Sequence, residues 1–297
     1  MKRNILSIHL AAFLFGMTGI LSTLIEADST VITFGRALFA VLVLTPLLLF
    51  WGQQDRAACP KMASPHMLSN TAVWWRCLVS GLLLSVHWVT FFIAVKTAGV
   101  ALATLGFSSF AAFITLIEWL TARQQITRMD WLRTLVVSGG LVVLIPTLDL
   151  ADQNTYGFVM GLLSGLSFAG MAVFNSRFLV SINPIRVARN QNVIVLLLLA
   201  AWAVPALSAL SLSSWFWLAL LGICCTGLSH SLFVFSLARM RVNVAGLVIA
   251  LEPVYAIVAA WLLFHEIPTL RTITGGIIIV IAIIGVNYAK TRQHASH

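Results

Sequence analysis

Long apolar runs separated by short polar connections follow one another along the whole chain. A run of about 20 apolar residues is the length at which a helix crosses the hydrocarbon core of a bilayer. Most connections carry turn or helix-end residues, and only residues 51–73 form a long one. The pattern predicts an all-α integral membrane protein whose ten transmembrane helices span roughly residues 5–25, 30–50, 74–95, 98–121, 131–149, 156–178, 184–206, 213–236, 242–264 and 270–289.

The composition also indicates a membrane protein and argues against a soluble one. Of the 297 residues, 60% are hydrophobic and 9% are charged, whereas about a quarter of the residues in a soluble domain are charged. We therefore expect the lipid bilayer to contact most of the surface. The net charge of +9 is interpreted as a topology signal and not as a nucleic-acid-binding surface. The four cysteines lack CxxC spacing and metal-ligand neighbours, so we expect small core residues and no metal or cofactor.

The basic residues indicate which ends of the helices face the cytoplasm. If the N-terminus is cytoplasmic, all of the 18 Lys and Arg residues except Arg36, Lys96 and Arg271 lie at cytoplasmic helix ends or in cytoplasmic loops. Such a bias is the positive-inside rule of multi-pass membrane proteins. The charges therefore predict that both termini are cytoplasmic and that the first apolar run is an uncleaved helix.

The two halves of the sequence resemble each other weakly. A shift of 142 residues pairs Trp75 with Trp217, Trp88 with His230, Phe91 with Phe233 and Trp119 with Trp261, and a shift of 153 pairs Phe15 with Phe168. Each half, residues 1–150 and 151–297, contains five predicted spans. Because five is odd, the second half must insert upside down relative to the first. Inverted repeats with a site at their interface are typical of transporters.

A carboxylate in the ninth predicted span is the strongest single candidate for function. In a helix that starts near Val242, Glu252 lies about 15 Å along the axis, close to the middle of the bilayer. Pro253 has no N–H to donate to the carbonyl of Ile249, which predicts a kink beside the acid. We expect Glu252 to contact substrate and, because burial disfavours an ionised carboxyl group, to carry a proton. The alternative is a structural acid hydrogen-bonded to another helix.

Histidines and aromatic residues share helix faces in the third and eighth predicted spans. His87, Trp88 and Phe91 lie on one face of the third span, and His230 and Phe233 lie on one face of the eighth. Each half therefore presents an imidazole and aromatic rings, and we expect these five side chains to contact substrate. The alternative for each histidine is a neutral ring bonded to a neighbouring helix.

Four further polar side chains are candidate substrate contacts: Ser108 in the fourth span, Asn175 in the sixth, Gln191 in the seventh and Tyr255 on the same face as the candidate carboxylate. Small and polar residues also allow membrane helices to pack closely, which is the alternative for Ser108 and Asn175. Gln191 could line the inner vestibule. Arg36 is interpreted as an interhelical or headgroup contact near the outer surface, not as a ligand.

Three sequence motifs resemble a known family: LEPVYAIVAAWLLFHE (251–266), ITGGIIIVIAIIGV (273–286) and TLGFSSFAAFITLIEWL (104–120). On these residues the chain resembles the drug/metabolite transporter superfamily, and within it the EamA-type bacterial exporters with ten helices in two inverted five-helix repeats. The resemblance implies a multi-pass protein of the bacterial cytoplasmic (inner) membrane. It also implies export of small metabolites such as amino acids through a central cavity by alternating access. We expect a monomer.

Two other function classes stay open. An uncoupled channel-like facilitator would use the same kind of polar route, and counterflow with and without a proton gradient separates it from an antiporter. An intramembrane enzyme is disfavoured because His265-Glu266 lacks the second histidine of a zinc site and because no Gly-x-Ser-x-Gly occurs. Ser229 and His230 are sequence neighbours, so they cannot face each other on a helix. The sequence does not identify the substrate.

Overall fold

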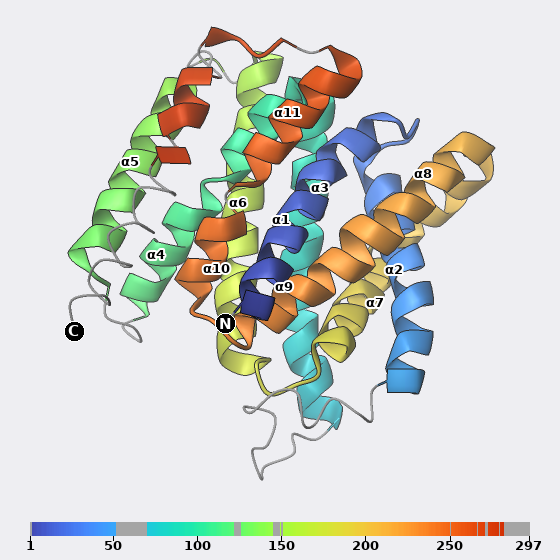
Figure 1. Cartoon of the computed structure of the whole chain (residues 1–297). Helices are drawn as coiled ribbons and strands as arrows, with labels where there is room; N and C mark the ends of the chain where they lie inside the picture. Colours follow the sequence, from blue (N-terminus) through green and yellow to red (C-terminus); the bar gives the residue numbers. More distant parts are fainter. Residues whose placement is uncertain are drawn as a thin grey trace.

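The computed structural model describes residues 2–51, 70–121, 126–144, 149, 151–249, 251–265, 267–270, 273–278 and 280–281. All regular structure in these residues is helical (Figure 1). Within them, six stretches are long and apolar enough to cross a membrane: Leu6–Thr23, Ser29–Leu49, Asn70–Phe107, Gln153–Phe178, Pro184–Ala209 and Leu212–Leu237. The predicted all-α membrane fold is therefore confirmed. Most of the tenth predicted span and most of the long loop, with Cys59, lie outside the described residues.

The helices follow one another with short connections. In chain order they are α1 (Lys2–Thr23), α2 (Ser29–Trp51), α3 (Asn70–Phe107), α4 (Phe110–Leu120), α5 (Arg128–Leu144), α6 (Gln153–Phe178), α7 (Pro184–Ala203), the 3-10 helix η3 (Val204–Ala209), α8 (Leu212–Gly222), the π-helical turn η4 (Ile223–Leu228), α9 (Ser229–Leu237), α10 (Val242–Ile249) and α11 (Glu252–Phe264).

Capping side chains explain several helix starts. Asn183 accepts hydrogen bonds from the backbone N–H groups of Ile185 and Arg186 in front of α7. Ser211 accepts one from the N–H of Ser214 in front of α8. Both caps satisfy N–H groups that have no partner inside the helix. These two connections therefore carry helix-end residues, as predicted for most connections.

Two predicted spans are broken where the sequence predicts continuous helices. The expected single kinked helix over 242–264 is wrong: α10 ends at Ile249 and α11 begins at Glu252. Pro253 then lies in the first turn of α11, where its missing N–H removes no helical hydrogen bond. In the other half the backbone reverses at Gly99 (φ 79°), a conformation that favours glycine. The helix after it stops at Phe107, and α4 begins at Phe110.

The two breaks occupy equivalent places in the two halves of the chain. Ile249 lies 142 residues after Phe107, and Glu252 lies 142 residues after Phe110. This offset is the shift that pairs the tryptophans of the two halves in the sequence. One consequence is that Ser108, expected in the middle of a helix, lies instead in the break between α3 and α4.

Small residues bring α3 and α6 into close contact, and the two helices run side by side (Figure 1). A Cβ atom at Gly161 would lie 3.0 Å from the carbonyl oxygen of Ala103, and one at Gly165 would lie 2.7 Å from that of Phe107. In lipid the hydrophobic effect does not drive helices together, so membrane helices associate through such close packing contacts. In this pair of helices the close approach therefore depends on glycines.

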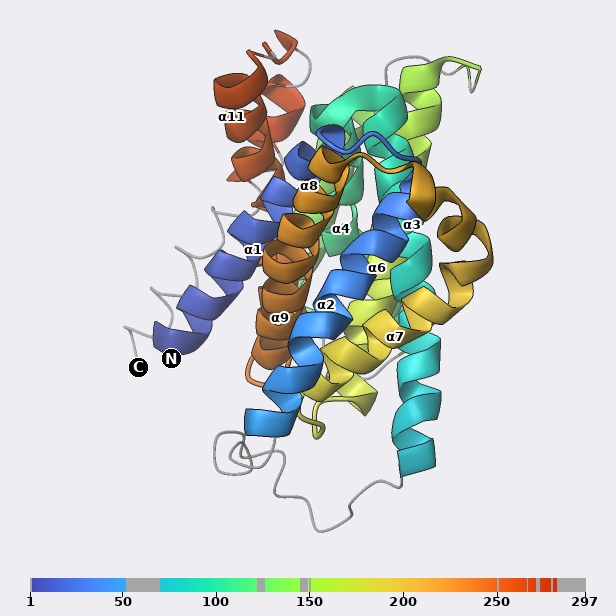
Figure 2. The ribbon, with the colours of Figure 1, turned by 90° about the vertical axis from the view of Figure 1, so that its right-hand side faces the viewer.

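Helix α2 crosses the bundle between α7 and the α8–α9 segment (Figure 2). Its end at Trp51, the start of α3, the end of α6 and the start of α7 lie at one end of the bundle, the lower end in Figure 1. Hydrogen bonds of 2.8 Å from Arg76 to the carbonyl of Phe178 and from Arg186 to Asn70 join helices there. We refer to it as the arginine-rich end.

Candidate functional site

A cavity lined by apolar and ionisable side chains lies inside the bundle. It has a volume of about 350 Å³, counting the open space at its mouth. Its lining residues come from α1, α2, α3, α6, α9 and α11: Phe15, Thr18, Arg36, Leu84, His87, Trp88, Phe91, Phe107, Phe168, His230 and Glu252. Both halves of the chain therefore contribute to it. Five of the ten predicted substrate contacts lie in this lining, namely His87, Trp88, Phe91, His230 and Glu252.

The two histidines are buried and each is held by a polar side chain of another helix. The Nδ1 atom of His87 lies 2.7 Å from the hydroxyl of Ser164 on α6, and its ring stacks on Phe107 at 4.9 Å. The Nε2 atom of His230 lies 2.7 Å from Oε1 of Gln191, so this ring nitrogen donates the hydrogen bond. Each histidine is therefore bonded to a neighbouring helix, as the structural alternative predicts. Both rings also line the cavity.

Gln191 and Asn175 lie in a buried network behind His230 and not in the lining. The amide nitrogen of Gln191 donates to the hydroxyl of Ser80 at 2.7 Å and to the amide oxygen of Asn175 at 3.0 Å. The network joins α3, α6, α7 and α9, which fixes the orientation of the His230 ring. Gln191 therefore positions a lining residue.

Arg36 is the arginine of the cavity lining, and it is buried between helices. Its side chain is only 1% exposed and crosses from α2 to η4. The Nε atom donates to the hydroxyl of Thr226 at 2.7 Å, and Nη2 donates to the carbonyl of Cys225 at 3.1 Å. The guanidinium carbon lies 4.2 Å from the ring centre of Trp88. The interhelical contact is thus confirmed, and the headgroup contact is not.

Glu252 is the acidic residue of the cavity lining. It is 3% exposed and is the first residue of α11, where the N-terminal N–H groups of a helix favour negative charge. Within the described residues no hydrogen bond to its carboxylate is formed, and Arg36 lines the same cavity. The hydrogen bond to another helix that the structural alternative predicts is therefore not seen in this part of the chain.

Three further predicted contacts, besides Gln191 and Asn175, lie outside the lining. Phe233 is buried next to it, with its ring stacked 5.1 Å from that of Phe168. The hydroxyl of Ser108 donates to the carbonyl of Leu105 at 2.6 Å. Tyr255 turns toward α1, where its ring meets that of Phe13 edge-on at 5.8 Å.

The lining residues that were not predicted as substrate contacts are Phe15, Thr18, Arg36, Leu84, Phe107 and Phe168. A signal existed for two of them, because the repeat pairs Phe15 with Phe168 and their rings lie 6.5 Å apart. Trp88 and His230 are a second repeat-related pair that meets, at 6.2 Å. An arginine inside an apolar span is also a functional candidate by default.

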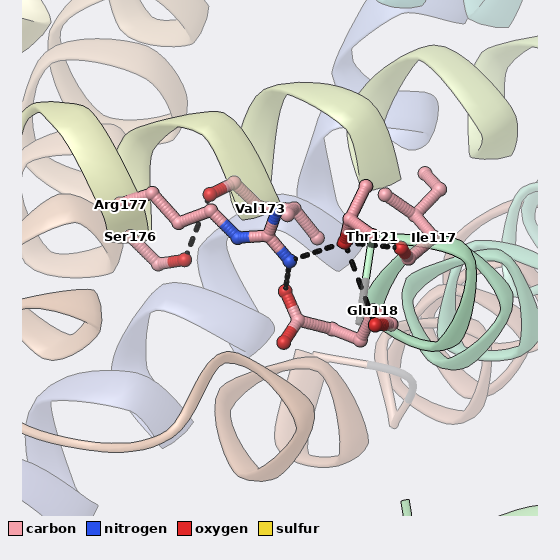
Figure 3. A network of polar contacts seen from close by, with 6 residues as sticks. All are labelled: Ile117, Glu118, Thr121, Val173, Ser176 and Arg177. Carbon is pink, nitrogen blue, oxygen red and sulfur yellow. Dashed lines mark hydrogen bonds and ion pairs between the residues drawn. The ribbon is translucent and has the colours of Figure 1, made fainter. Parts of the chain in front are cut away.

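At the arginine-rich end, an ion pair joins α4 to α6 (Figure 3). The Nη2 atom of Arg177 donates to Oε1 of Glu118 and, at 2.7 Å, to the hydroxyl of Thr121. Glu118 is 1% exposed and Arg177 is 17% exposed. The pair joins the first half of the chain to the second. The sequence pattern did not predict an ion pair between Glu118 and Arg177.

Comparisons with known proteins agree with this picture. The sequence matches the EamA-like transporter family over residues 2–145 and 155–288. It is 26% identical to a protein of Rickettsia conorii named S-adenosylmethionine uptake transporter, over 89% of this chain and 86% of that protein. An uncharacterized transporter of Archaeoglobus fulgidus is 24% identical over 94% of both chains.

A solved structure described only as "Crystal structure of protein" shares the fold, with a TM-score of 0.68, 15% identity and coverage of 96% of this chain and 98% of that one. The family match extends over nearly the whole chain in two successive segments. We conclude that this chain belongs to the EamA-like transporter family and is a membrane transporter, not an enzyme.

Proposed function

We propose that the protein exports small metabolites such as amino acids across the bacterial cytoplasmic membrane by alternating access. One observation carries the proposal: an arginine, a carboxylate and two histidines line a cavity buried within an apolar bundle. Ionisable groups are costly inside a membrane and mark the pathways of substrates and ions. Glu252 would couple export to proton entry.

We further propose that ten helices form two inverted five-helix repeats over residues 1–150 and 151–297. The two family matches and the two equivalent helix breaks support this arrangement. So do the repeat-related rings that meet at the cavity, because residues near a pseudo-twofold axis contact their own counterparts. The cavity would then lie at the repeat interface, as in other transporters built this way.

The arginine-rich end is proposed to face the cytoplasm. Arg76, Arg177 and Arg186 lie there, as the positive-inside rule requires of a cytoplasmic end. Both termini would then be cytoplasmic. We propose that the protein is a monomer.

S-adenosylmethionine is a second candidate substrate, because four relatives from Rickettsia carry the name S-adenosylmethionine uptake transporter. The cavity offers a carboxylate at Glu252, which attracts an organic cation. Those names describe uptake, the direction opposite to the one proposed here. Transport must therefore be measured both ways.

A binding screen followed by transport assays tests the proposal. Thermal shifts of the detergent-solubilised protein are measured against amino acids, quaternary amines, nucleosides and S-adenosylmethionine. Proteoliposomes loaded with each hit then report efflux, uptake and counterflow, with and without a proton gradient. Saturable counterflow supports alternating access, whereas flux without counterflow would favour a channel-like facilitator. The absence of any flux would overturn a transport role for this cavity.

A further inference from the structure

We infer that Arg36 is a carboxylate-binding subsite and that Glu252 receives the cationic group of the same ligand, so that the transported molecule is a zwitterion with an apolar body. The inference rests on the transport function proposed above and adds to it the role of each charge. It follows from how Arg36 is held, from which of its donors is free, and from where Glu252 lies.

The protein holds one side of the Arg36 guanidinium group in place. Nε and Nη2 are bound to Thr226 and to the carbonyl of Cys225, both on η4. The π-helical turn makes this possible, because Thr226 itself bonds back five residues to the carbonyl of Leu221. Single π-helical turns inside helices are frequent at functional sites. The side chain is therefore oriented before any ligand arrives.

The remaining nitrogen, Nη1, is buried and has no acceptor among the described residues. A buried donor without a partner is costly, and native proteins rarely keep one without a reason. Trp88 and Phe92 lie 4.2 Å and 5.3 Å from the guanidinium carbon and occupy its surroundings with apolar rings. A planar carboxylate is the group that matches the free donors of a planar guanidinium.

Glu252 supplies the opposite charge in the same cavity. Its carboxylate accepts no hydrogen bond from the described residues, and no ion pair within 4.0 Å joins it to Arg36. A ligand with one charge would pair with one of these groups and leave the other unpaired, which is costly in an apolar interior. A zwitterion pairs with both. The other lining residues include Phe15, Leu84 and Phe168, which suit an apolar body.

The test compares three ligands that differ only in their charged groups: leucine, 3-methylbutylamine, which lacks the carboxylate, and 4-methylpentanoate, which lacks the ammonium group. Every other zwitterion found in the screen is compared with its own amine and acid in the same way. We expect the zwitterion to bind the solubilised wild-type protein about 10- to 100-fold more tightly than either analogue, because each analogue forgoes charge-assisted hydrogen bonds. Equal binding of an analogue would overturn the inference.

Variants separate the two charges. Arg36→Gln should lose the preference for the zwitterion over the amine, and Arg36→Lys should restore part of it, since lysine keeps the charge without the planar fork. Glu252→Gln should lose the preference over the acid. Arg128→Gln is the matched control, because Arg128 is exposed at the start of α5 and its loss removes one positive charge far from the lining.

The outcomes distinguish this inference from the proposed function. If Arg36→Gln does not fold, the preference of Glu252→Gln still decides, because this amide keeps the volume of the acid. Saturable transport of uncharged or singly charged compounds only would overturn the zwitterion inference and leave the transport function intact. If both variants kept the preference for the zwitterion over its analogues, Arg36 and Glu252 would only balance each other's charge. That result would also overturn the zwitterion inference.

Discussion

The charge of Glu252 can be removed with little change of shape. We expect Glu252→Gln to fold like the wild type, since the amide keeps the side-chain volume, and to transport more slowly without response to a pH gradient, since an amide carries no exchangeable acid proton. Exchange at saturating substrate should persist. Proteoliposomes with and without an imposed gradient measure both properties.

The result also tests the structural alternative for Glu252. If the residue were only a brace, Glu252→Gln would transport normally and Glu252→Ala would fail to fold, because a buried partner would lose its bond. Wild-type rates and wild-type pH dependence in Glu252→Gln would remove this residue from proton coupling. His87 and His230, the other ionisable lining residues besides Arg36, would then be the next candidates.

The ion pair of Glu118 and Arg177 should contribute measurably to stability. Glu118→Ala leaves Arg177 without its charged partner at a site that is mostly buried. We expect a loss of about 1–3 kcal/mol, less than for a fully buried pair because Arg177 is partly exposed. The thermal unfolding midpoint in detergent should fall for this variant and stay unchanged for the exposed control Arg128→Ala. An unchanged midpoint in Glu118→Ala would show that the pair contributes nothing.

At the residue scale, helical spacing predicted the lining only in part. It correctly grouped His87, Trp88 and Phe91, because side chains three and four positions apart share a face. It could not tell which helix that face meets. Arg36 was therefore interpreted as an interhelical or headgroup contact, and Gln191 was placed in the site although it lies behind His230. The orientation of a face is set by the packing of distant helices.

The contact between α3 and α6 depends on single glycines. Gly165→Ala places a Cβ atom 2.7 Å from the carbonyl oxygen of Phe107, on backbone that cannot move without shifting the helix. We expect a loss of about 1–3 kcal/mol and a lower unfolding midpoint.

Gly170→Ala is the matched control in the same helix. A Cβ atom there lies 3.7 Å from the Leu83 side chain, which is an ordinary contact. Because alanine favours a helix over glycine, this variant should be neutral or more stable by up to about 1 kcal/mol. Equal destabilisation of both variants would contradict the close contact at Gly165.

At the element scale, hydropathy predicted where helices occur but not where they break. The segment over 98–121 is apolar throughout, so nothing in its periodicity separates α3 from α4 at Ser108. Pro253 did mark the other break, although the prediction was a kink. Hydropathy reports how apolar the side chains of a segment are. That value is the same whether the helix is broken or continuous.

The whole molecule should have its arginine-rich end inside the cell. In a background without the natural cysteines, Ser208→Cys on η3, at the opposite end of α7 from Arg186, should react with an impermeant thiol reagent added to intact cells. Asn70→Cys at the start of α3 should react only after the cells are opened, as should Met62→Cys. Both positions 70 and 208 are exposed, so neither is shielded by the fold. Labelling of Asn70→Cys in intact cells would invert the topology.

At the scale of the whole molecule, the sequence predicted the membrane fold well because lipid imposes one requirement on every span, an apolar run of sufficient length. The cavity could not be predicted in the same way. It depends on which residues six helices, distant in the chain, bring together, and a single sequence reports only faces of individual helices.

The two helix breaks have an electrostatic consequence for the middle of the membrane. Both α4 and α11 begin roughly halfway along a predicted span, so each directs the positive end of its dipole toward the interior of the bundle. Continuous helices would place those ends at the surfaces, where water screens them. A negative charge halfway across, whether on Glu252 or on a passing ligand, is therefore partly compensated by the backbone itself. The barrier to carrying such a charge is therefore lower at this depth than a hydrophobic slab alone would make it.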